Sequence, residues 1–134
     1  MLLCDAAESV GGKLYVLGGG WSHIQTPNVP VNMALAVKLS IPWDQANQPI
    51  RLKASLYDED RHNVIRLGEE QVPIELEGNI EAGRPPGLRP GTSLDAPFVL
   101  NFPGVTLGSG GYEWVLEVDG NVRASVPFRV LEPR

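Results

Sequence analysis

The sequence predicts an all-β fold, an antiparallel two-layer β-sandwich of immunoglobulin-like or related topology with about nine strands. Apolar and polar residues alternate along many short segments, as they do on strands that bury one face. The 134 residues include 15 glycines and 12 prolines, which are unfavourable inside helices and mark turns between short strands. Helical periodicity is hard to find anywhere. Without crossover helices, neighbouring strands are expected to run antiparallel.

The alternation is clearest in the segments IRLKASLYD and GYEWVLEVDGNVRASVPFRVLE. In the first, residues 50–58, every second residue from Ile50 to Leu56 is apolar. In the second, the alternation passes through Trp114, stops at the turn Asp119-Gly120 and resumes at Val122, which is expected to face the core. This pattern predicts a hairpin of central core strands with Trp114 buried. The other strands are expected at residues 2–7, 14–17, 32–40, 64–67, 72–77 and 98–101.

Turn-forming residues divide these strands. The segments 10–12 and 58–63 predict two further hairpins, and the proline-flanked segment 41–49 predicts one helical or 3₁₀ turn. Residues 78–95 hold four glycines and three prolines and predict a long irregular loop, which is often functional or mobile. Residues 1–134 contain no internal repeat, and their number fits one hydrophobic core, so a single domain is expected.

Three glycines in the segment KLYVLGGGWSHI, residues 13–24, have two interpretations. A phosphate-binding loop needs a helix after the glycines, often with a lysine within reach. Here Pro27 and Pro30 prevent a sustained helix, and no lysine occurs between Lys13 and Lys38. We therefore expect the glycines to allow a bulge or a sharp bend in the backbone.

Charge and cysteine content narrow the range of partners. The net charge of −5 argues against nucleic acid and against anionic membrane surfaces, which both attract basic patches. No segment reaches the roughly 18 apolar residues of a membrane helix, and the start of the chain lacks the features of a signal peptide. The single cysteine, Cys4, cannot form an intramolecular disulfide. We expect a cytoplasmic protein.

The sequence contains no recognisable catalytic motif. Ser22 and His23 are adjacent and would face opposite sides of a strand, and Cys4 lies in an expected strand where a thiol packs like an apolar group. We therefore expect no enzymatic activity and no cofactor. Potential metal ligands are densest at Asp58, Asp60 and His62, but one short turn offers too few of them, so a solvated hairpin tip is the favoured interpretation.

Aromatic and cationic side chains near loops are the candidate binding residues. A tryptophan at a loop margin can line a pocket, and an arginine beside a proline-stiffened segment suits an acidic or planar partner. Such loops also cross protein surfaces without binding anything. The candidates are Trp21, Trp43, Arg84, Pro85, Pro86 and Arg89.

Two functions are compatible with these features. The first is a non-enzymatic protein-binding or self-assembly module that uses exposed strand edges to pair with another copy or with a protein partner. The alternative is a small-molecule or carbohydrate-binding domain in which Trp21, Trp43 and the loop from Gly83 to Gly91 form one cleft. The sequence does not show which strands lie at the edges.

The segments CDAAESVGGKLYVLGGGW, GRPPGLRPG and GYEWVLEVDG resemble an uncharacterised bacterial family, a domain of unknown function common in actinobacteria. The resemblance covers nearly the whole chain and includes an ADAA-like start, here Cys4 to Ala7, followed by GKLY(V/I)LGGGW. It implies a compact cytoplasmic β-sandwich. It carries over no activity, cofactor or catalytic residue.

Overall fold

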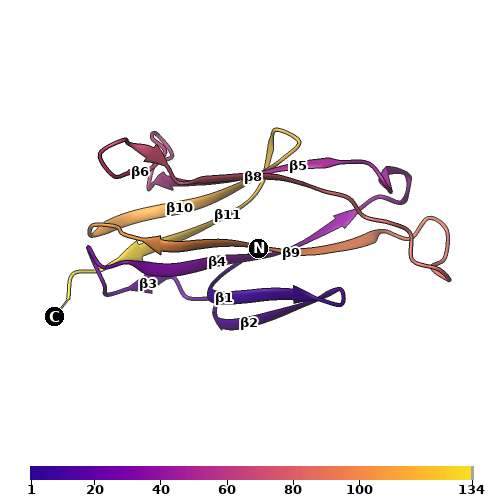
Figure 1. Ribbon diagram of the computed structural model, residues 1–134, viewed down its shortest axis with the longest axis horizontal. Helices are drawn as coiled ribbons and strands as arrows, with labels where there is room; N and C mark the ends of the chain where they lie inside the picture. The colour runs from indigo at the N-terminus through magenta and orange to yellow at the C-terminus, as the bar shows by residue number, and fades with distance from the viewer. Residues whose placement is uncertain (134) are drawn as a thin grey trace.

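Two β-sheets face each other across one apolar layer in the computed structural model, which describes residues 1–133 and confirms the predicted all-β sandwich (Figure 1). The first sheet has the strand order β2-β1-β4-β9 and the second β3-β11-β10-β5-β8, while β6 and β7 form a small separate pair. The elements are β1 (Leu2–Val10), β2 (Lys13–Gly19), β3 (His23–Ile24), β4 (Val31–Ile41), the 3₁₀ turn η1 (Trp43–Gln45), β5 (Ile50–Asp58), β6 (Arg66–Leu67), β7 (Val72–Pro73), β8 (Glu75–Ile80), β9 (Leu94–Val105), β10 (Gly110–Val118) and β11 (Asn121–Val130).

The core lies between the inner faces of the two sheets. Trp114 of β10 is fully buried, as predicted, and its ring centroid lies 4.2 Å from that of Phe102 on β9. The alternating apolar residues of β5 are also buried. The face of β5 that the sequence pattern predicts to be apolar is therefore the face that packs in the core. A second cluster, around Ile41, Ile50 and Leu94, fills the end of the sandwich beside η1.

The structure corrects several sequence expectations. The sequence does not predict β3, because a two-residue strand inside a polar loop is too short to show alternation. β3 pairs with β11 in parallel, whereas neighbouring strands were expected to run antiparallel. β9 runs over twelve residues instead of four, so the loop expected at residues 78–95 is shortened to residues 81–93. The expected strand at residues 72–77 is divided between β7 and β8.

Val122 is 51% exposed and does not face the core as predicted. The pairing of β10 with β11 shifts by one residue, from Leu116 opposite Ala124 to Glu117 opposite Val122. This β-bulge places Arg123 in the strand without an opposing residue and turns Val122 to the face that Glu117 occupies. A period-two reading cannot detect such a shift.

The β1–β2 hairpin leaves the first sheet and folds over its outer face. β1 pairs with β4 only at residues 2–4, and the rest of β1 pairs with β2 alone. Ala7 and Leu14 of the hairpin pack with Val99 against the buried Cys4 and neighbouring small residues of β4, and Ser9 Oγ donates a hydrogen bond to the Pro97 carbonyl at 3.2 Å. Figure 1 shows the hairpin as a third layer, on the side of β4 and β9 away from the second sheet.

Glycines permit the bend of this hairpin, as the sequence predicts. Gly18 has φ +59°, and a Cβ there would lie 2.7 Å from Cγ of Asp5. A Cβ on Gly19 would lie 2.8 Å from side-chain atoms of Leu2 and Val16. β3, not a helix, follows these glycines, so the chain lacks the strand, loop and helix order of a phosphate-binding loop.

None of the helical segments within residues 1–133 has the length and apolar character that spanning a bilayer requires.

Replacing Gly18 by alanine should destabilise the protein more than replacing Gly12, since the two positions share a positive φ but only Gly18 contacts another side chain. Gly12 has φ +75° with open space around it, so Gly12→Ala carries the backbone cost alone, about 1–2 kcal/mol. Gly18→Ala should cost about 1 kcal/mol more, because Asp5 must move. Urea unfolding measures both. Equal costs, or an excess that persists in Asp5→Ala/Gly18→Ala, would contradict the packing described.

Candidate functional site

The outer edge of β2 differs from the other sheet edges. Soluble proteins protect exposed edges with charges, prolines or bulges, since an unpaired edge offers backbone groups to another strand. β2 has one charged residue, Lys13, at its start, and then runs LYVLGG without charge or proline. Among the other edges, β3 is only two residues long, and the rest carry such residues: Asp95, Pro97 and Pro103 on β9, Glu75 and Glu77 on β8, and Arg123, Pro127 and Arg129 on β11.

Apolar side chains accompany this open edge. Tyr15, Val16 and Leu17 are 56%, 36% and 72% exposed, and with Ala6 of β1 they form what we call the β2 patch. A groove of about 350 Å³ follows it, bordered by Glu8. An apolar patch on a strand that has one free edge is typical of an interaction surface.

Trp43 and Arg84, two of the predicted binding residues, contact each other. The Arg84 guanidinium carbon lies 4.2 Å from the Trp43 ring centroid, and Nε and Nη2 donate hydrogen bonds to the Trp43 carbonyl at 3.2 and 2.7 Å. Arg84 therefore fastens the loop of residues 81–93 onto η1 rather than projecting as a docking cation. Pro85 and Pro86 lie in an exposed turn, where Leu88 N–H donates to the Pro85 carbonyl.

Arg89 is exposed and its carbonyl accepts a hydrogen bond from the Thr92 N–H at 3.1 Å. Its side chain takes part in none of the ion pairs found within residues 1–133. Of the two arginines in this loop, one therefore supports the structure and one faces solvent.

Trp21 lies at the other end of the sandwich. Its ring meets Phe128 edge to face, with centroids 5.7 Å apart, beside Tyr112 at the start of β10. Trp43 packs on the cluster that includes Val118 at the end of β10. Six residues of strand separate Tyr112 from Val118, about 20 Å at ~3.4 Å per residue. The structure does not bring Trp21, Trp43 and the loop into one cleft, as the alternative function requires.

The turn after β5 uses its acidic residues for local structure. Asp58 accepts hydrogen bonds from the His62 N–H at 2.8 Å and from the Asn63 side chain at 3.3 Å. Desolvation raises the pKa of Asp58, but these hydrogen bonds and a backbone hydrogen bond from Asn63 outweigh it, so the pKa lies below its ordinary value. Among residues 1–133, no group of three or more His, Cys, Asp or Glu side chains, Asp60 included, is arranged to hold a metal ion.

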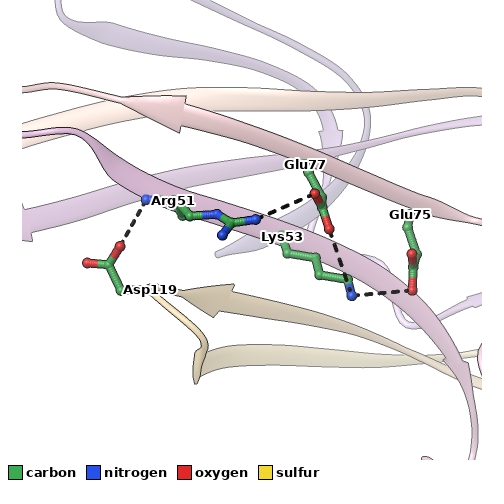
Figure 2. Close-up of polar contacts among 5 residues, drawn as sticks. All are labelled: Arg51, Lys53, Glu75, Glu77 and Asp119. Carbon is green, nitrogen blue, oxygen red and sulfur yellow. Dashed lines mark hydrogen bonds and ion pairs between the residues drawn. The ribbon is translucent and has the colours of Figure 1, made fainter.

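Ion pairs cover the outer face of the second sheet. Lys53 lies 3.7 Å from Glu75 and 3.9 Å from Glu77, and Arg51 lies 3.9 Å from Glu77 (Figure 2). The Asp119 carboxylate accepts a hydrogen bond from the backbone N–H of Arg51 at 3.0 Å (Figure 2). Exposed pairs of this kind contribute little stability, about 0–1 kcal/mol each. They do make this face polar and strongly hydrated, in contrast to the β2 patch.

Of the residues that resemble nucleophiles and bases, Cys4 lies inside β1, whereas Ser22 precedes β3 and His23 begins it, both with exposed side chains. Cys4 is fully buried, and its Sγ donates to the Ala34 carbonyl at 3.3 Å. Burial raises the pKa of the Cys4 thiol, and the neighbouring Asp5 raises it further, so the thiol stays protonated and inert. The Ser22 carbonyl accepts the Arg129 N–H, and His23 pairs with Arg129 in β3.

Together, the fold and its surfaces define a β-sandwich that bears a bent hairpin with an open, apolar edge strand. The chain matches the model of a family of unknown function, DUF6941, over residues 1–131, and it belongs to that family. Neither the curated proteins nor the solved structures contain a match to it. The family assignment agrees with the resemblance noted from the sequence, while its particular motifs and its actinobacterial origin stay predictions.

Replacing Arg84 by alanine should loosen the loop of residues 81–93. The variant loses the contact with the Trp43 ring and two hydrogen bonds to its carbonyl, which together predict a loss of about 1 kcal/mol in the free energy of unfolding. The Trp43 indole resonance in the NMR spectrum should shift. Arg89→Ala is the matched control and should change stability by less than about 0.5 kcal/mol. Equal effects of the two variants would contradict the anchoring role of Arg84.

The low pKa of Asp58 predicts a pH-dependent contribution to stability. Because the folded-state pKa lies below the unfolded one, this contribution is complete above the unfolded value of about 3.9 and is lost as the pH falls through the folded pKa. Asp58→Asn should therefore be less stable than the wild type at neutral pH. The difference should begin to shrink below about pH 4 and disappear once the pH is below the folded-state pKa. Thermal unfolding across this range tests it, and a constant difference at all pH values would contradict it.

Proposed function

We propose that this protein is a non-enzymatic module that binds protein by adding a strand to the outer edge of β2. The observation that supports the proposal most directly is the absence of charge and proline from residues 14–19, beside exposed Tyr15, Val16 and Leu17. The partner that purified protein can test is a second copy of the chain. A strand from another protein would use the same edge.

Strand addition suits the physical character of this edge. Every second residue of an antiparallel edge strand directs its N–H and C=O away from its neighbour, so β2 can form a new ladder along the residues before Gly18, where a φ of +59° bends the strand. The β2 patch would remove apolar surface from water at the same time, at about 25 cal/mol per Å². Backbone hydrogen bonds would align the added strand along β2, and side-chain contacts would fix which residues of the two strands lie opposite each other.

Pairing of two copies is free of charge conflict. If two β2 strands run antiparallel with Val16 opposite Val16 of the second copy, Tyr15 lies opposite Leu17 of that copy on the exposed face. Lys13 then lies opposite Gly19, so the two lysines do not meet. Aromatic and aliphatic residues in cross-strand pairs are favourable by about 0.2–1 kcal/mol each.

The expected dimer is weak. Seven residues of β2 span about 24 Å at ~3.4 Å per residue, a narrow strip beside the roughly 800 Å² per partner of a stable interface. Association should therefore depend on concentration in the range open to solution measurements.

The finer points of topology and location support this proposal without being required by it. We propose an immunoglobulin-like topology, which is supported by the strand orders β1-β4-β9 and β11-β10-β5-β8 and by the parallel pairing of β3 with β11, since these resemble an A-B-E and G-F-C-C′ arrangement. Such sandwiches commonly act in protein recognition. A cytoplasmic location is proposed on the single buried cysteine and the acidic composition.

Light scattering over a wide concentration range tests the proposal. The apparent mass of the wild type should rise from that of a monomer toward that of a dimer, and Leu17→Lys should remain monomeric because charge at an edge opposes pairing. Val122→Lys is the matched control, since Val122 is also exposed, at 51% against 72% for Leu17, but lies on the protected edge of β11. It should associate like the wild type.

Two results would contradict self-pairing through β2: a wild type that is monomeric at every concentration, or equal loss of association in both lysine variants. A pull-down with the wild type and Leu17→Lys as paired baits then tests for a different protein partner. A protein retained by the wild type and lost with Leu17→Lys would bind at the β2 edge, and equal retention by both baits would mean that the edge is not used.

A further inference from the structure

A second surface, away from β2, has the character of a small-molecule site. A cleft of about 500 Å³ opens between the two sheets where β4 ends and the β10–β11 turn begins. This volume lies within the roughly 300–1,000 Å³ of known ligand sites. Its floor is apolar and comes from both sheets, with Leu39 and Ile41 on β4 and Val118 on β10.

The strand pairing explains why the sandwich is open here. β1 pairs with β4 only at residues 34–36 of β4, so residues 37–41 have a strand partner, β9, on one side. In the opposite sheet, β11 pairs with β3 only at Arg129 and Val130, and Asn121 and Arg123, at the unpaired end of β11, border the same opening. Within residues 1–133, residues 37–41 of β4 and residues 121–128 of β11 therefore each have a strand partner on one side alone.

The rim of the cleft is polar and carries one cation. Ser40, Gln45 and Asn121 supply neutral hydrogen-bonding groups, and Arg123 supplies a guanidinium. Arg123 is the residue that the β-bulge adds to β11, and bulges commonly redirect a side chain beside a functional site. In the described part of the chain, Arg123 takes part in none of the ion pairs.

The acidic residue of the rim limits the charge of a ligand. Asp119 also lines the cleft, and its carboxylate is held by the Arg51 N–H at 3.0 Å (Figure 2). One fixed negative charge beside one arginine favours a singly charged anion over a dianion, because like charges repel at short range. The planar guanidinium fork matches a carboxylate in geometry.

We propose that this cleft binds a small organic monocarboxylate with an apolar body, with Arg123 holding the carboxylate and Leu39, Ile41 and Val118 contacting the apolar part. The site is independent of the β2 edge, so either surface can fail its test without affecting the other.

NMR titration of the ¹⁵N-labelled protein tests the proposal. The probes are octanoate and phenylacetate, their uncharged amides, and octyl phosphate as a dianion. The carboxylates should produce saturable shifts at the amides of Ile41, Val118 and Arg123. The amides should bind at least about tenfold more weakly, the loss expected for one charge-assisted hydrogen bond.

Substitutions provide the matched comparison. Arg123→Gln should weaken carboxylate binding at least about tenfold and leave the rest of the spectrum unchanged, since Arg123 is exposed and unpaired in the described chain. Arg89→Gln, which removes an exposed arginine outside the cleft, should bind as the wild type does.

Several outcomes would overturn the proposal. These are no saturable shift with either carboxylate, equal binding of the amides, unchanged binding by Arg123→Gln, or shifts that concentrate at Val16 and Leu17 instead of the cleft. Tighter binding of octyl phosphate than of octanoate would refute the monocarboxylate class.

Discussion

The contact between Trp114 and Phe102 is the constraint on which the rest of the structure depends. These side chains join β10 of one sheet to β9 of the other, with ring centroids 4.2 Å apart, and Trp114 is entirely removed from water. A side chain of this size fills the layer between the sheets and fixes both their separation and the face that each strand turns inward. Once β10 is placed in this way, its neighbours β5 and β11 must present their own apolar residues to the same layer, and the polar residues of β5 form the ion pairs outside.

The sequence was sufficient for the fold class because burial on one face imposes a period of two. Residues 50–56 show that period, and residues 112–118 show it with Val115 as the exception. It was insufficient where the chain departs from a regular ladder. A one-residue bulge at Arg123 inverted the expected orientation of Val122, and the two-residue β3 is too short to show a pattern. The strand β9 was underestimated because Pro97 and Pro103, typical of turns, lie within it at a sheet edge that tolerates them.

Site residues were harder to predict, since a side chain's role depends on what the fold places beside it. The sequence predicts both Arg84 and Trp43 as binding residues. In the structure the Arg84 guanidinium instead packs on the Trp43 ring and donates a hydrogen bond to the Trp43 carbonyl. Asp58, a weak metal-ligand candidate in a segment better interpreted as a hairpin tip, accepts a hydrogen bond within its own turn. The β2 edge and the Arg123 cleft were missed because each is defined by missing neighbours: a strand without an outer partner, and two sheets that separate at one side. The uncharged run LYVLGG was the one available signal for the first.

The small residues beneath the bent hairpin have a dynamic consequence. Cys4, Ala34 and Ala36 form a thin apolar layer with Ala7, Leu14 and Val99, far less surface than the main core buries. Detachment of the hairpin from this layer should cost only a part of the global free energy of unfolding. Amide protons of the hairpin should therefore exchange with deuterium through local opening, whereas those of β10 should exchange only through complete unfolding. The arm that carries β2 is thus held by a smaller apolar layer than the strands of the main core, to which β1 is tied only at its start, by Leu3 and by the pairing of residues 2–4 with β4.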